Sequence, residues 1–220
     1  MKKLITLLIA YLIIPSITLA HDPPKGLEWG MSYKEVKSHL EGLSNEKKVK
    51  VRKLQKKRLK TLLSRDQIPS AISNARLGTV KLFGEKSEDA FVFFHEKKGL
   101  CGVEYIFDWI NDKDNKNQFM RGRDHSWKYY QNLVKALTDK YGSPEYDETD
   151  GKSENHITPH TKLSALWLDH ETNDTIKVTI TRQQRNAIVT LLDQFFVVIE
   201  YRNVVYENAV KEAAKKTDEI

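Results

Sequence analysis

The sequence predicts an α+β protein in which helices cover an antiparallel sheet. Two observations lead to this prediction. Segments at 77–109 and again at 163–202 alternate apolar and polar residues with a period of two, as half-buried strands do. A helical segment closed by a glycine precedes each group, at 32–41 and at 126–141. The repeated order suggests a duplicated unit of one helix followed by a β-meander.

The first twenty residues have the order of a secretory signal peptide. Two lysines precede an apolar block at 4–14, and small residues close the segment at Ala20. The block is shorter than the roughly twenty apolar residues that a membrane span needs. We therefore expect residues 1–20 to be removed by cleavage between Ala20 and His21, and the protein to be exported, periplasmic or secreted. An uncleaved N-terminal anchor is the alternative.

The first predicted half covers 21–110. Its helix at 32–41 begins with a capping box, because Ser32 caps the first turn and Glu35 lies three residues further on. The segment 44–64 has features of both a strand and a helix, and the choice stays open. Three strands of an antiparallel meander then follow, at 77–83, 90–95 and 100–109.

The third of these strands contains Cys101, the only cysteine, so the chain has no internal disulfide. Period-two alternation predicts that Cys101 shares one packed side with Val103 and Tyr105, with Glu104 and Asp108 on the wetter side. We expect Cys101 to be a small buried hydrophobe, because thiol reactivity needs exposure and a cationic neighbour.

A polar link at 111–125 is the predicted boundary between the two halves. The second half covers 126–203, and its helix at 126–141 has an apolar stripe that includes Trp127 and Tyr130. A polar loop at 145–161 leads into the second meander. Its strands are predicted at 163–169, 175–182, 187–192 and 195–202, the last two possibly as one bent strand, before a C-terminal helix at 207–216 within the tail 204–220.

Two short motifs carry a resemblance to a known group of proteins. Trp29-Gly30-Met31-Ser32 with Glu35-Val36, and Tyr141-Gly142 with Pro144, resemble the opening and the helix end of secreted bacterial proteins of unassigned function. The resemblance implies a sheet covered by two helices. That layout is similar to the helix-and-meander repeats of the secreted beta-lactamase inhibitor protein and of small outer-membrane assembly lipoproteins, which bind proteins and catalyse nothing. This chain lacks their disulfides and lipid-bearing cysteine.

A dense basic run is the first candidate site. The chain has 36 Lys and Arg against 30 Asp and Glu, a net charge of +6, and no acidic residue lies between Glu46 and Asp66. Such a run can hold phospholipid headgroups, lipopolysaccharide phosphates or an acidic protein, and export makes nucleic acid an improbable target. A solvated cationic face is the alternative. The candidate residues are Lys47, Lys48, Lys50, Arg52, Lys53, Lys56, Lys57, Arg58 and Lys60.

Three histidines are weak candidates for a metal site. His156 and His160 are four residues apart, and His170 follows the next predicted strand. A helix would place the first two on one face, but Pro159 between them disfavours a regular helix. Neutral loop histidines are the alternative interpretation.

The sequence contains no Gly-x-Ser-x-Gly nucleophile motif and no glycine-rich phosphate loop. We therefore expect a non-enzymatic exported binding module without a cofactor, whose partner is an envelope protein or an anionic surface component. The rival hypotheses are a metal-assisted hydrolase built on the histidines and a peripheral binder of anionic membranes built on the basic run.

Overall fold

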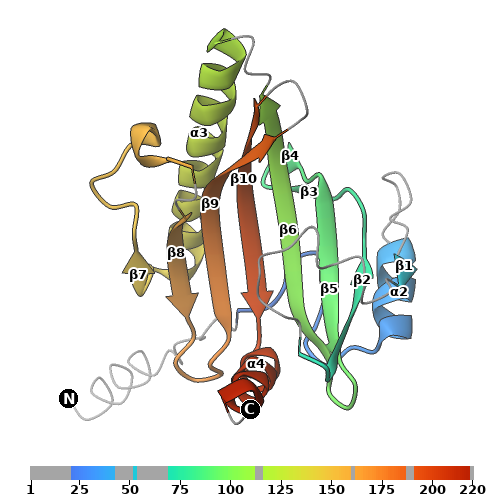
Figure 1. Ribbon diagram of the computed structural model, residues 1–220. Coiled ribbons are helices and arrows are strands. Elements are labelled where there is room, and N and C mark those ends of the chain that lie inside the picture. Colours follow the sequence, from blue (N-terminus) through green and yellow to red (C-terminus); the bar gives the residue numbers. More distant parts are fainter. Residues whose placement is uncertain are drawn as a thin grey trace, which may run out of the picture.

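The computed structural model describes residues 21–42, 52–53, 69–111, 116–159, 162–186 and 191–218. These residues form an α+β fold, which confirms the predicted class (Figure 1). The elements in chain order are α2 (Tyr33–Gly42), β1 (Arg52–Lys53), β2 (Ile72–Arg76), β3 (Lys81–Leu82), β4 (Glu85–Lys86), β5 (Asp89–His95), β6 (Gly99–Asn111), α3 (Lys116–Tyr141), β7 (Tyr146–Asp147), the 3-10 turn η2 (Glu154–His156), β8 (Lys162–Leu168), β9 (Thr175–Asn186), β10 (Leu191–Arg202) and α4 (Val204–Asp218).

One antiparallel sheet runs through both predicted halves. Its strand order is β1-β2-β5-β6-β10-β9-β8-β7, and β3 and β4 form a separate hairpin. The two halves meet where β6 pairs with β10, in a register that runs from Gly102 opposite Arg202 to Asn111 opposite Asp193. The sheet is therefore continuous across the predicted boundary, and the duplication stays a prediction.

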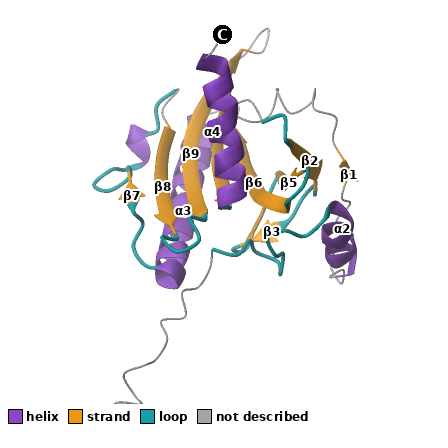
Figure 2. Ribbon diagram, turned by 90° about the horizontal axis from the view of Figure 1, so that it is seen from below, coloured by secondary structure: helices purple, strands orange, loops and turns teal. Residues whose placement is uncertain are grey.

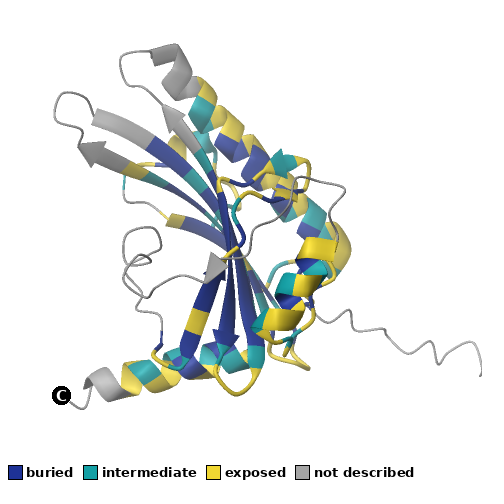
Figure 3. Cartoon of the chain, turned by 90° about the vertical axis from the view of Figure 1, so that its right-hand side faces the viewer, coloured by how far each residue is buried: buried dark blue, intermediate teal, exposed yellow. Residues whose placement is uncertain are grey.

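The first face of the sheet is closed by α3 and α2. Figure 3 shows both helices on one side of the sheet, and α3 contacts β6, β9 and β10. Tyr130 and Leu133 of α3 are fully buried there, as the predicted apolar stripe requires. The inward positions of β9 are buried as well, as the alternation predicted: Ile176, Val178 and Ile180.

The N-terminal residues join this first face at the end of β5 and β6. The backbone N–H of Gly30 donates to the Leu100 carbonyl (2.9 Å), and the Leu100 N–H donates to the Met31 carbonyl (2.7 Å). The predicted capping box is confirmed, since Ser32 N–H donates to Glu35 Oε2 (2.7 Å) and Glu35 N–H donates to Ser32 Oγ (3.3 Å). The helix that follows packs against the same core.

The second face carries α4 at one end (Figures 1 and 2). Tyr206 and Ala209 of α4 pack with Phe93 and Cys101 in a smaller apolar cluster. The helix begins at Val204 rather than at the predicted residue 207, because Asn203 Oδ1 accepts from the N–H groups of Val205 (3.0 Å) and Tyr206 (3.2 Å). No helix in the described ranges is long and apolar enough to cross a membrane.

The strand predicted at 77–83 is wrong in position. The strand in this region is β2, which ends at Arg76, and the backbone at Gly78 turns through a positive φ of 75°. The chain then continues into the short hairpin that β3 and β4 form. Because glycine adopts positive φ without a steric penalty, Gly78 turns the chain inside the segment where alternation of side chains predicts a strand.

Two predicted connections contain regular structure. Helix α3 begins at Lys116, so the link expected at 111–125 is wrong over most of its length. The sequence there has no apolar stripe that would predict a helix. The loop expected at 145–161 contains β7 and η2. The strand expected at 187–192 is described only at its end, where residues 191–192 belong to β10.

A β-bulge reverses the side of Cys101. The partner of Phe93 is Gly102 and the partner of Phe94 is Leu100, so Cys101 is an extra residue between them. The thiol consequently packs on the second face, opposite to Val103 and Tyr105, and the predicted shared side is wrong. The expected burial of Cys101 is confirmed.

We expect Cys101 to resist thiol reagents in the folded protein. Burial raises the pKa of its thiol to about 12, so the reactive thiolate is scarce at mildly alkaline pH. Alkylation should be slow in buffer and rapid in denaturant, as measured by mass spectrometry over time. Equal rates in the two conditions would contradict the burial of this side chain.

Substitution of Gly99 by alanine should destabilise the fold strongly. The residue has a φ of +72°, and a Cβ there would lie 2.1 Å from the Gly30 carbonyl oxygen. We expect Gly99→Ala to lower the free energy of unfolding by about 3 kcal/mol, from overpacking added to backbone strain. Gly78→Ala is the matched control, since its φ is +75° with no atom within 4 Å. Urea unfolding should show a loss of only about 1 kcal/mol for the control, and equal losses would refute the steric argument.

Candidate functional site

The second face of the sheet presents accessible side chains on the strands whose first face is closed by α3. Lys177 of β9 lies opposite Glu200 of β10 and Leu166 of β8, and Thr179 lies opposite Val198. Residues on opposite positions share a face, so these side chains form one surface. We call this surface the open face; its accessible or half-buried members are Lys162, Leu166, Leu168, Lys177, Thr179, Gln183, Phe196 and Val198.

A charged cluster borders the open face toward β6. Glu104 of β6 lies directly opposite Glu200 of β10, and Arg202 follows two residues along the same strand. Only 6% of Glu104 is exposed, and within the described residues its Oε1 has no hydrogen-bond partner. The cluster therefore holds two adjacent carboxyl groups, one of which is removed from water.

Arg202 ties this cluster to α4. Its guanidinium donates to Glu200, lies 3.7 Å from Glu207 of α4, and stacks 4.6 Å from the centroid of the Tyr206 ring. Burial lowers the pKa of Arg202, but the attraction of Glu200 and other acidic groups outweighs it, so the pKa is raised. The arginine thus stays charged while it connects the sheet to the helix.

The buried carboxyl of Glu104 has a pKa well above 4.5. Burial is the main cause, and repulsion from Glu200 adds to it. A carboxyl group with a raised pKa holds its proton to higher pH than a solvated glutamate does, and in that form it can donate a hydrogen bond. The protonated group can donate its proton, and its unpaired Oε1 can contact another polar group.

A second polar pair lies at the other end of the same face. Gln194 Nε2 donates to Asp108 Oδ2 (2.9 Å), and Gln194 is buried although its Oε1 has no partner among the described residues.

The expectation of a solvated side at Glu104 is wrong, because the alternation of a strand shows on which side a residue lies and not what packs above it.

The basic run is described only at β1. Arg52 lies opposite Arg76 and Lys53 opposite Ala75, at the edge of the sheet. The short strand agrees with the strand alternative for these two residues. The other candidate residues lie outside the described part of the chain: Lys47, Lys48, Lys50, Lys56, Lys57, Arg58 and Lys60.

The candidate histidines have separate partners. His156, in η2, accepts a hydrogen bond at Nδ1 from Ser153 N–H (3.0 Å). His170 lies 3.3 Å from Glu145 and is 71% exposed. His160 is outside the described residues. Within the described ranges, no three His, Cys, Asp or Glu side chains lie close enough together to hold a metal ion.

His21, the residue after the predicted cleavage point, is part of the fold. Only 5% of it is exposed, its Nδ1 forms a hydrogen bond with the Asp174 carbonyl (3.1 Å), and its ring contacts Tyr141 edge-on at 4.8 Å. The residue thus links the N-terminal segment to the turn before β9 and to the end of α3.

Glu104→Gln should remove a pH-dependent loss of stability. The unfolded chain releases this proton near pH 4.5 and the folded protein retains it to higher pH, so Glu104 lowers stability progressively above that pH. The advantage of the glutamine variant should therefore grow by about 1.4 kcal/mol per pH unit until the folded group ionises. Chemical unfolding from acidic to neutral pH measures this. The exposed Glu96→Gln is the control, and parallel curves for both variants and the unaltered protein would contradict the assignment.

The comparisons with known proteins give no information about function, so a proposal must rest on the residues and their geometry. No family model, no curated protein and no solved structure matches this chain.

Proposed function

We propose that the protein is an exported binding module that holds a protein partner of the cell envelope against its open face. A single observation carries the proposal. Strands β8, β9 and β10 are buried on the side of α3, where Ile176 and Val178 are fully enclosed, while Lys177 and Thr179 on the same strand point to the accessible side. The strands are thus supported by α3 on the first face, and their side chains on the open face are accessible.

The composition of the open face suits a protein partner. Phe196, Val198 and Leu166 are half-buried and supply apolar area, while Lys162 and Lys177 are exposed and charged. The apolar side chains stand on β8 and β10 with the polar side chains of β9 between them, and protein interfaces combine apolar area with polar contacts. The adjoining Glu200, which is half-buried, offers an acceptor for donors on the opposing surface.

Export supports the choice of partner. The leader predicted at 1–20 directs the chain out of the cytoplasm. The buried position of His21 is compatible with a mature chain that begins there, because the side chain already packs against Tyr141. An exported partner is then the kind of molecule that the open face meets.

Site-specific photo-crosslinking in intact cells tests the proposal. A photoreactive residue at Thr179 or at Lys177 should form the same discrete crosslinked species, because both positions lie on the open face. Lys135, which is exposed on α3, is the matched control and should not form it.

The yield at Thr179 should fall when Phe196 is replaced by alanine, since the aromatic ring supplies apolar area at the interface. Absence of a species from both sheet positions, or an equal species from Lys135, would overturn the proposal. Circular dichroism of each variant verifies that the fold is intact.

A further inference from the structure

The β3–β4 hairpin has an exposed aromatic residue in a strained backbone position. Phe83 has a φ of +49° and Gly84 a φ of +86°, and 45% of Phe83 is exposed. Two successive positive φ values are typical of a type I′ turn, whose first position favours asparagine or glycine. A bulky side chain there costs backbone strain without gaining burial. Folding alone does not explain a phenylalanine at this position.

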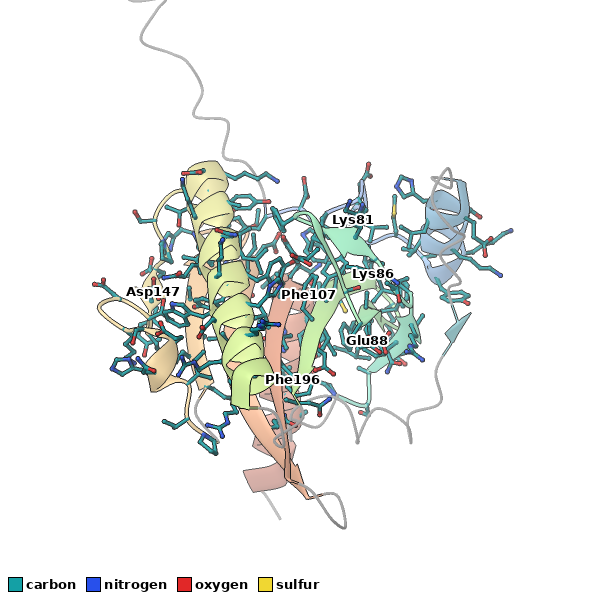
Figure 4. The ribbon with its side chains drawn as sticks, turned by 90° about the horizontal axis from the view of Figure 1, so that it is seen from above. Lys81, Lys86, Glu88, Phe107, Asp147 and Phe196 are labelled. Atoms are coloured by element: carbon teal, nitrogen blue, oxygen red, sulfur yellow. The ribbon has the colours of Figure 1, made fainter. Side chains whose placement is uncertain are left out.

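The strands of the same hairpin place two like charges together. Lys81 lies directly opposite Lys86, and both are exposed. Cross-strand partners share a side, so the two ammonium groups repel each other. Figure 4 shows the two lysines on the hairpin to the side of α3. This second unfavourable feature lies within three residues of Phe83.

The other side of the hairpin is anchored to the body of the protein. Leu82 is buried, and its carbonyl accepts a hydrogen bond from the Tyr129 hydroxyl of α3 (3.2 Å). Glu85, opposite Leu82, lies 3.6 Å from His125 of the same helix. At the base, the Val80 N–H donates to Ser87 Oγ (2.9 Å). The aromatic tip and the two lysines are therefore presented on a fixed support.

We propose that this hairpin is a contact site for an anionic phospholipid surface, with Phe83 entering the headgroup region and Lys81 and Lys86 binding lipid phosphates. Aromatic rings favour the membrane interface, and lysines near the surface of an anionic bilayer are attracted to it. Phosphates between the lysines also relieve their mutual repulsion. The site is independent of the open face, since the hairpin is attached to α3 on the first side of the sheet.

A lipid surface suits this hairpin better than a protein does. A stable protein interface buries roughly 800 Å² on each partner, more than one aromatic tip with two-residue strands can supply. A fluid bilayer needs no matching shape and accommodates a single ring. The acidic Glu85 faces α3 rather than the lysine side, and the exposed Glu88 lies beyond the end of β4.

Sedimentation of the full chain with vesicles tests the proposal. The unaltered protein should bind phosphatidylglycerol vesicles, bind neutral phosphatidylcholine vesicles poorly, and dissociate as salt is added. Phe83→Asn should weaken binding about tenfold, because the ring no longer leaves water. The same variant should raise the melting temperature, because asparagine tolerates positive φ. Lys81→Gln and Lys86→Gln should each weaken binding about fivefold.

Tyr146→Asn is the matched control, since Tyr146 is an exposed aromatic residue at the far edge of the sheet; its binding should equal that of the unaltered protein. Several results would overturn the proposal. These are equal binding to both kinds of vesicle, no binding to either, undiminished binding of Phe83→Asn, and a lower melting temperature for that variant. A hairpin-dependent crosslink to a protein without vesicle binding would replace the lipid by a protein partner.

Discussion

The pairing of β6 with β10 is the contact on which the rest of the structure depends. It joins strands from the two halves of the chain, from Gly102 opposite Arg202 to Asn111 opposite Asp193. Only when these strands are paired does α3 find a surface that spans β6, β9 and β10 to cover. The same pairing sets Glu104 beside Glu200, so one register determines both the apolar core and the charged cluster.

The two faces of this sheet meet different physical demands. The first face is an apolar core in which side chains such as Tyr105 and Val178 are fully enclosed. The second face carries buried polar groups, among them Glu104, whose pKa is raised because burial and Glu200 both oppose ionisation. Arg202 offsets part of this cost by binding Glu200 and by holding α4 through Glu207. The face that costs stability is therefore the one that also carries the proposed binding surface.

The proposed surfaces lie on different parts of the molecule. The open face belongs to β8, β9 and β10, whereas the β3–β4 hairpin is fastened to α3 through Tyr129. A protein held at a lipid surface by the Phe83 hairpin would thus still present Lys177 and Thr179 to a partner. If both proposals hold, the fold is a rigid support between two contact sites.

The sequence by itself determined the α+β class, the capping box of Ser32 and Glu35, and the buried stripes of α3 and β9, because side-chain period and local caps are properties of neighbouring residues. Tertiary structure decided the rest. The bulge at Cys101 changed its side, and α4, about a hundred residues away in the chain, packed beside Glu104. The strand predicted at 77–83 includes Phe83, but its positive φ places it in a turn. Burial of a polar group and strain in a turn depend on contacts between distant segments, which local periodicity does not encode.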